Sequence, residues 1–318
     1  MALKGKWKGV LRCTSFFLIL ILLLFGCSYV VTPKNNQKAF GMDMVSANGI
    51  LGEKKNTIDV LFVGDSESYC TFSPMQIWKQ YGFTSYVCGT PLQPLYDATR
   101  FVKLTFETQK PKVVVLETNA IFREYGIGSY LLSKGQNYFS VLRYHDRWKN
   151  LSVNDFGSAI SYTWTDDYKG YQYDTKIVPS KNIDYMRYTS DKAEIPMINQ
   201  LELQKIHALC RENGAQLIFV STPSTKNWNY KRHNSVQAFA DEHDILYLDM
   251  NLLEDLQIDW NKDTRDAGDH LNHSGAKKAT TYYGNYLKEQ FSLEDHRNDP
   301  EYKSWNEAYQ RYSKIVKE

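Results

Sequence analysis

The sequence predicts an α/β fold, a three-layer α/β/α sandwich around a central parallel five-stranded sheet. Two observations carry this prediction. Short runs of β-branched and other apolar residues alternate along the chain with longer segments of helical spacing, and short links containing Gly or Pro join them. With 318 residues, of which 42% are hydrophobic and 23% charged, the chain can also bury one substantial core.

The chain opens with a segment that is expected to cross a membrane. Lys4, Lys6, Lys8 and Arg12 precede an uncharged run, 13–31, which is about long enough for a transmembrane helix. Basic residues on this side are expected to hold the N-terminus in the cytoplasm and to send the rest of the chain outside. No small-residue cleavage site follows, which favours an uncleaved anchor over a removed signal peptide.

A lipoprotein is the alternative to this anchor. The residues before Cys27 resemble a bacterial lipobox, in which Cys27 would be lipidated after cleavage, but Phe25 fits poorly where a small residue is expected. The next segment, 32–56, is polar and contains Pro33 and Gly41, so it is expected to be a spacer between the membrane and the domain.

Each predicted strand is bounded by turn signals. The first, 58–63, is an apolar β-branched run that ends at Gly64, as is typical of a strand buried inside a parallel sheet. The later strands are expected at 84–88, 113–117, 215–220 and 245–249. Because helices separate the strands, we expect right-handed crossovers and a doubly wound, flavodoxin-like sheet.

The helices are predicted from their caps and spacing. Ser73 and Pro74 supply an N-cap and a first-turn proline for a helix that Gly82 ends. Further helices are expected at 95–109, 195–213, 235–243 and 274–291. The stretch 121–194 is too long for a crossover, so an inserted lid or subdomain is expected there. The domain itself is expected over 57–292, followed by a charged, helical surface tail over 293–318.

Composition excludes some classes of partner and cofactor. The chain has 38 Lys+Arg against 36 Asp+Glu, so it has no large excess of positive charge that would attract nucleic acid. Its 23 Tyr and 7 Trp suit sugar faces, although aromatic residues are more often simply part of a core. Cys70, Cys88 and Cys210 form no disulfide-dense framework and have no metal-ligand spacing, so we expect neither a metal nor a cofactor.

Polar residues gather where the predicted strands end. Ligands of an open parallel sheet bind beyond the carboxyl ends of its strands, so these positions are candidates for a site. In chain order they are Gly64-Asp65-Ser66, Gly89, Asn119 and the run 263–276, which contains Asp266, Asp269 and His270.

These residue types fit acyl transfer through a serine. A serine hydroxyl is a weak nucleophile until an imidazole takes its proton, so Ser66 requires His270 as its base. A carboxylate must hold the imidazole in the right tautomer, and Asp266 or Asp269 can do so. The tetrahedral intermediate needs donors for its oxyanion. The predicted donors are the backbone N–H groups of Ser66 and Gly89 and the side-chain amide of Asn119.

This pattern resembles the SGNH (GDSL) hydrolase superfamily, whose four blocks supply a serine, a glycine, an asparagine and a histidine in that order. The resemblance covers roughly residues 57–290. Two departures stand out. The family's Asp lies three residues before the His, where this chain has Ala267. The third block, usually Gly-x-Asn-Asp, has Glu117 in place of the glycine, so Asn119 has a helix cap as its alternative role.

The anchor, the blocks and the long insertion together resemble the alginate and cellulose acetyltransferases and the teichoic acid D-alanyl transfer proteins of bacterial cell membranes. That resemblance implies extracytoplasmic O-acyl transfer, of acetyl in particular, onto a cell-surface polysaccharide through an acyl-Ser66 intermediate. It also implies a multispanning membrane acyltransferase as partner. A carbohydrate esterase or deacetylase with the same triad is one alternative, and a non-catalytic glycan-binding scaffold is another.

The insertion contains a dense polar and aromatic cluster formed by Arg143, His145, Arg147 and Trp148. Guanidinium groups and rings of this kind can stack on a sugar and bond its hydroxyl groups, which predicts a substrate-binding role. The alternative is a structural tether that holds the insertion in place.

Overall fold

The computed structural model describes residues 2–317, with side chains from residue 7 onward, so the side chains of Lys4 and Lys6 lie outside the described residues. The chain forms two compact units. Unit 1 consists of the chain up to Asp43 together with Tyr125–Tyr162. Unit 2 consists of Met44–Glu124 and the chain from Thr163 onward.

Unit 2 is built on a five-stranded, wholly parallel sheet with the order β2-β1-β3-β4-β5. The strands are β1 (Val60–Gly64), β2 (Ser85–Gly89), β3 (Val113–Glu117), β4 (Gln216–Ser221) and β5 (Leu246–Asp249). In the sheet, β2 lies on one side of β1 and β3 lies on the other side. The order of the strands therefore reverses at β1, and such a switch point is where ligands of doubly wound sheets bind.

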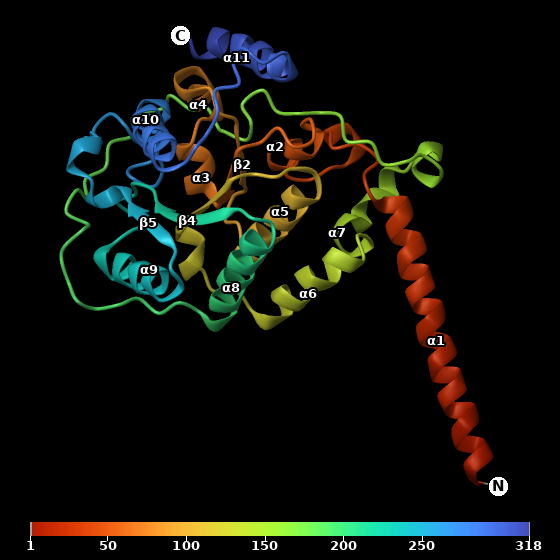
Figure 1. Ribbon diagram of the computed structural model, residues 1–318. Helices are drawn as coiled ribbons and strands as arrows, with labels where there is room; N and C mark the ends of the chain where they lie inside the picture. Colours follow the sequence, from red (N-terminus) through yellow and green to blue (C-terminus); the bar gives the residue numbers. More distant parts are fainter. Residues whose placement is uncertain (1, 318) are drawn as a thin grey trace. The chain divides into compact units, whose positions relative to one another are not determined.

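Helices cover both faces of this sheet (Figure 1). Those of unit 2 are α2 (Val45–Asn48), α3 (Ser66–Thr71), α4 (Pro74–Tyr81), α5 (Leu95–Thr108), α8 (Met197–Glu212), α9 (Tyr230–His243), α10 (His273–Gln290) and α11 (Lys303–Val316). Short 3₁₀ segments in unit 2 are η2 (Gly49–Gly52), η3 (Asn119–Phe122), η6 (Met250–Leu252), η7 (Glu254–Leu256) and η8 (Pro300–Tyr302). The predicted α/β/α sandwich is confirmed.

Two hydrophobic cores form because successive residues of a strand point to opposite faces. In β1, Leu61 and Val63 pack into a core that also contains residues of α5 and α8, such as Phe101 and Leu203. Val60 and Phe62 pack into a second core with residues of α4 and α10. This burial on both faces explains why the strands read as continuous apolar runs in the sequence.

Unit 1 is assembled around the long helix α1 (Ala2–Val31). By length and composition, Trp7–Val31 can cross a membrane, and a signal sequence near the N-terminus would have the same features. The other elements of unit 1 are η1 (Lys38–Phe40), α6 (Ile127–Tyr138), α7 (Val141–Tyr144), η4 (His145–Asn150) and η5 (Val153–Phe156). Phe25 packs against Phe139, and Thr32 Oγ1 lies 2.5 Å from Ser140 Oγ.

The expected spacer, 32–56, differs from the prediction in its second half. Residues 44–56 belong to unit 2, where Ala47 and Ile50 are buried in the first core. Glu53 forms a buried ion pair with Lys169, with 2.7 Å between Oε1 and Nζ. The sequence did not predict this packing, because residues 44–56 contain only a few apolar residues in a mostly polar stretch.

The expected insertion, 121–194, is divided between the two units. Its helical part, Tyr125–Tyr162, belongs to unit 1. The remainder, 163–194, has no helix or strand and runs over unit 2 as a strap held by backbone hydrogen bonds. Lys169 O accepts from Val87 N at 2.9 Å, and Gln172 N donates to Tyr69 O at the same distance.

The tail over 293–318 is helical, as expected, but it is part of the domain. Trp305, Ala308 and Tyr312, which share one face of α11, are buried in the first core. The Trp305 ring packs against Trp78 of α4, with 5.5 Å between ring centroids. The tail's high charge resides on the opposite, exposed face of an amphipathic helix.

Candidate active site

Ser66 lies at the switch point of the sheet, directly after β1. It is the first residue of α3, and Asp65 caps this helix, with Oδ1 accepting from the backbone N–H of Glu67 at 3.1 Å. Asp65 Oδ2 accepts from Asn119 Nδ2 at 2.9 Å and from Arg123 Nη2 at 2.6 Å. Because Asp65 is fully buried and bonded on both oxygens, the turn that carries Ser66 is held in one conformation.

His270 reaches Ser66 from the loop before α10. Its Nε2 lies 2.8 Å from Ser66 Oγ, and its Nδ1 lies 2.6 Å from Asp266 Oδ2. With Nδ1 protonated and donating to Asp266, Nε2 is left to accept the serine proton. The geometry is that of a serine nucleophile, its base and an orienting carboxylate.

The structure distinguishes the two candidate carboxylates. Asp266 accepts from both the ring and the backbone N–H of His270, the latter at 2.7 Å. Asp269 Oδ1 lies 3.8 Å from His270 Nδ1 and instead accepts from Asn227 Nδ2 at 2.6 Å. Asp266 is therefore the carboxylate that holds the His270 ring, and Asp269 belongs to a neighbouring hydrogen-bond network.

The loop geometry explains how a carboxylate four residues before the histidine reaches its ring. Ala267 and Gly268 both adopt the left-handed conformation, with φ of 63° and 87°. These two residues turn the chain back so that Asp266 faces His270. The turn is held in place because Thr264 Oγ1 accepts from Gly268 N at 2.8 Å and Ala267 N donates to Val178 O at 2.9 Å.

The charges around His270 favour its protonated form. Burial alone would lower the pKa of His270, but the hydrogen bond to Asp266 and the negative charges of Glu67, Asp266 and Asp269 outweigh burial and raise it. For Asp266, burial works against ionisation, and the hydrogen bonds with His270 prevail and hold the pKa of this carboxyl below its usual value. Each partner thus stabilises the charged form of the other.

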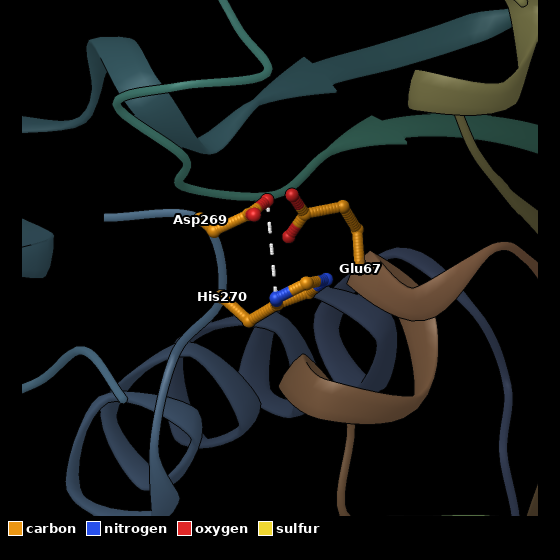
Figure 2. Close-up of side chains that lie close together, drawn as sticks. All are labelled: Glu67, Asp269 and His270. Carbon is orange, nitrogen blue, oxygen red and sulfur yellow. Dashed lines mark ion pairs between the residues drawn. The ribbon is translucent and has the colours of Figure 1, made fainter. Parts of the chain in front are cut away.

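Glu67 is a buried carboxyl beside the base, and the sequence did not single it out. Figure 2 shows the carboxyl groups of Glu67 and Asp269 over the His270 ring. Asn227 Nδ2 donates to Glu67 Oε1 at 2.7 Å and so bridges Glu67 and Asp269. Glu67 Oε2 has no hydrogen-bond partner among the described residues, and burial raises the pKa of Glu67 well above its usual range.

The same three side chains have the composition of a metal site. One oxygen each from Glu67 and Asp269 and one nitrogen of His270 lie within 4.8 Å of one another. However, the amide of Asn227 already bridges the two carboxyl groups, and both ring nitrogens of His270 have partners in Ser66 and Asp266. Hydrogen bonds account for this arrangement except at Glu67 Oε2, which has no partner among the described residues.

The predicted oxyanion donors lie around the serine. Gly89 ends β2 beside Gly64, and a Cβ at Gly89 would come within 2.4 Å of Ser68 Oγ and 3.1 Å of Asp65 O, so the close approach requires glycine. Asn119 is the first residue of η3, and the cap position of this helix is occupied by Thr118. The amide group of Asn119 donates to Asp65 and its Oδ1 accepts from Arg232 Nη1 at 3.0 Å, so its NH₂ group points toward the turn of Ser66.

Tyr69 is a further polar group at the serine that the sequence analysis missed. It lies one turn after Ser66 on α3, and burial raises the pKa of Tyr69 to about 12. The phenol therefore stays protonated at neutral pH and remains a donor. Neither Tyr69 nor Glu67 gave a sequence signal, because residues in the first turns of a helix are usually exposed, and acidic residues are common there.

The cluster predicted to bind substrate lies in unit 1, whereas Ser66 and His270 lie in unit 2. Arg143 pairs with Asp43 at 2.7 Å, and Arg147 pairs with Asp155 at 2.8 Å and donates to Val31 O. These two arginines fit the tether alternative, within unit 1. The ring of His145 and that of Trp148 are exposed, and their role in binding stays a prediction.

The cysteines are unpaired thiols. Cys70 and Cys88 are buried and not bonded to each other, and Cys88 Sγ donates to Ala47 O at 3.5 Å. Burial raises the pKa of both thiols, so they are packing residues of low reactivity.

A comparison with protein-family models found no match, and a search of curated proteins found none either. Among solved structures, a GDSL-like lipase from Bacteroides thetaiotaomicron is similar at 12% identity and a TM-score of 0.36, over 73% of this chain and 88% of that one. The lipase/acylhydrolase from Enterococcus faecalis is similar at 10% identity and a TM-score of 0.40, over 74% and 99%. Similarity this low does not establish a shared activity, so the function is argued from the site.

Proposed function

We propose that this protein is a serine esterase or acyltransferase of the SGNH type, with Ser66 as nucleophile, His270 as base and Asp266 as the residue that orients the base. One observation carries the proposal. Ser66 Oγ lies 2.8 Å from His270 Nε2, and His270 Nδ1 lies 2.6 Å from Asp266 Oδ2. These contacts lie at the edge of the sheet where ligands of such folds bind.

The reaction follows from this arrangement. Ser66 Oγ attacks the ester carbonyl while His270 Nε2 takes the hydroxyl proton, and Asp266 stabilises the imidazolium that results. The negative charge on the former carbonyl oxygen is stabilised by the N–H groups of Ser66 and Gly89, by Asn119 and by the Tyr69 phenol. His270 then gives its proton to the leaving alcohol, which leaves an acyl group on Ser66.

A second nucleophile completes the cycle by attacking the acyl-serine, with His270 again accepting its proton. If the nucleophile is a sugar hydroxyl, the acyl group is transferred, and if it is water, a free acid is released. We favour transfer, of acetyl in particular, onto a cell-surface polysaccharide on the outer side of a bacterial membrane. The membrane-length helix within α1 supports attachment, and tethering would raise the local concentration of acyl donor from a multispanning acyltransferase partner.

The proposal is tested in two steps. Labelling of Ser66 by a fluorophosphonate probe, absent in Ser66→Ala, separates an enzyme from a non-catalytic glycan-binding scaffold. Product partition from the acyl-enzyme, measured with and without an oligosaccharide acceptor, then separates transfer from hydrolysis. If the intact protein releases only free acid across a panel of acceptors, and if its loss raises polymer acylation in cells, the deacetylase replaces the transferase.

A further inference from the structure

A cavity of about 350 Å³ opens beside the catalytic serine in unit 2. Three segments far apart in the chain, 44–47, 89–91 and 170–172, line it together with Tyr69 of α3. Tyr69 follows Ser66 by one turn of α3, and Gly89, one of the predicted oxyanion donors, lies against Asp65 and Tyr69, so the cavity lies beside the turn that carries Ser66. Its volume lies near the lower end of the range for small-molecule pockets, about 300–1,000 Å³.

The lining is neutral and has both polar and apolar parts. Every residue that lines the cavity is uncharged. The ring of Tyr69 and the side chains of Met44 and Val45 supply apolar surface, while Ser46 and Gln172 supply hydroxyl and amide groups. This mixture differs from the wholly apolar wall that a long acyl chain requires, and an acetyl group alone would leave most of the space empty.

The nearest cation is neutralised within the protein. Arg265 donates to Gln172 Oε1 at 3.4 Å, and its guanidinium lies 3.6 Å from Asp174 and 3.8 Å from Asp266. Two carboxylates thus offset one guanidinium, which leaves no surplus positive charge for an anionic ligand. With Oε1 occupied by Arg265, the N–H groups of the Gln172 amide remain to bond a hydroxyl oxygen.

The walls of the cavity are fixed before any ligand binds. Tyr86 Oη donates to Ser46 O at 2.7 Å, which holds the segment 44–47. On the opposite wall, Gly170 has a φ of 88°, and a Cβ there would lie 1.9 Å from Val87 O. Tyr171 Oη lies 3.1 Å from His273 Nδ1, so the ring beside the cavity is also held. A preformed site loses less conformational entropy on binding.

From this lining we infer that the cavity binds a neutral pyranose ring, the sugar unit whose hydroxyl group donates or receives the acyl group at Ser66. The apolar face of such a ring matches the Tyr69 ring, and its hydroxyl groups match Ser46 and Gln172. The inference rests on the proposed function and narrows its substrate to uncharged polysaccharides. Uronate and phosphate-containing polymers would place a charge against an uncharged wall.

Binding tests the inference without relying on turnover. Saturation-transfer NMR on the full-length protein in detergent would compare methyl β-glucopyranoside with methyl β-glucuronide. The neutral sugar is expected to bind more tightly. Gln172→Ala is expected to weaken its binding about fivefold, as for the loss of one neutral hydrogen bond. Ser46→Trp, at an exposed position of the lining, is expected to fill the cavity and abolish binding.

Gln290→Ala, an exposed glutamine at the end of α10, is the matched control and should leave sugar binding unchanged. Tighter binding of the glucuronide, or unchanged binding in Ser46→Trp with an unchanged unfolding transition, would overturn the inference. Turnover of p-nitrophenyl acetate by the wild type and by Ser66→Ala is measured in parallel. Equal rates there would refute the proposed function instead, so the two failures are distinguishable.

Discussion

Ser66 Oγ lies 2.8 Å from His270 Nε2, and in the proposed mechanism the two act as one unit in proton transfer, so removing either should remove the function of both. Ser66→Ala and His270→Ala are each expected to lower kcat for an activated ester by about 10⁴-fold or more, and the double variant should be hardly worse. Steady-state kinetics on the three variants, with circular dichroism as the folding control, would check this. A wild-type rate in Ser66→Ala would refute the assignment of the nucleophile.

The two carboxylates near the base should behave differently on substitution. Asp266→Asn is expected to lower kcat by about 10⁴-fold, because an amide in that place favours the wrong tautomer of His270. Asp269→Asn should cost far less, since Asp269 contacts Asn227 and lies 3.8 Å from the ring. Measurements of kcat for Asp266→Asn and Asp269→Asn, side by side, test this difference. Equal small losses in both variants would indicate that Ser66 and His270 act as a dyad.

The pH dependence of activity reports the state of His270. The base must be neutral, and its pKa is raised above the ordinary value by Asp266 and the neighbouring acids against the effect of burial. Activity is therefore lost as pH falls, and the midpoint in kcat/KM is expected above about 6.5. In Asp266→Asn the residual activity should show a lower midpoint, because the largest raising contribution is gone while burial remains. An unchanged midpoint in this variant would contradict the account.

At the scale of elements, the segment 44–56 is fastened to the strap 163–194 by the buried pair Glu53–Lys169, whose side chains are 3% and 1% exposed. Glu53→Gln should lower the free energy of unfolding by about 3–5 kcal/mol, because it leaves the Lys169 charge buried without its partner. Chemical denaturation would measure the change. Glu301→Gln, which breaks the exposed pair with Lys54, is the control and should cost at most about 1 kcal/mol.

A combined variant, Glu53→Gln with Lys169→Met, removes the charge along with its partner. It should recover much of the stability lost in Glu53→Gln, since a well-packed apolar side chain often replaces a buried ion without loss. Equal stability of Glu53→Gln and Glu301→Gln would show that Lys169 is not confined as the structure has it. The pair matters for function because the two segments that it joins both line the cavity that we infer to bind a sugar.

At the scale of the whole molecule, the proposed membrane attachment rests on α1, whereas the candidate active site lies in unit 2. Residues 7–23 are exposed, whereas Ser28 and Val31 have partners within unit 1. A chain that lacks the residues before Leu24 should therefore keep these contacts and still hydrolyse small esters, but it should no longer acylate the surface polymer in cells. Ester turnover and polymer acylation, measured side by side, test this. Persistent acylation by the truncated chain would refute the need for membrane attachment.

The amino-acid sequence by itself determined the α/β/α architecture and the place of the candidate site. Strands buried on both faces must be apolar throughout, so β1 and β3 were visible as uninterrupted runs. Because the carboxyl ends of parallel strands all lie at one edge of the sheet, the residues that follow the strands are expected close together, which predicts one site formed by Ser66, Asn119 and the loop of His270.

Between Asp266 and Asp269 the sequence favours Asp266, because a side chain directly before His270 has little room to turn back onto its ring. The left-handed turn at Ala267 and Gly268, which brings Asp266 to that ring, is visible only in the tertiary structure. The tertiary structure also shows that Glu67 lies beside His270 and accepts a hydrogen bond from Asn227, which is 160 positions from Glu67 in the chain. The physical reason is the same in both cases. Periodicity and composition record which surfaces are apolar, whereas polar contacts depend on geometry between residues that the chain separates.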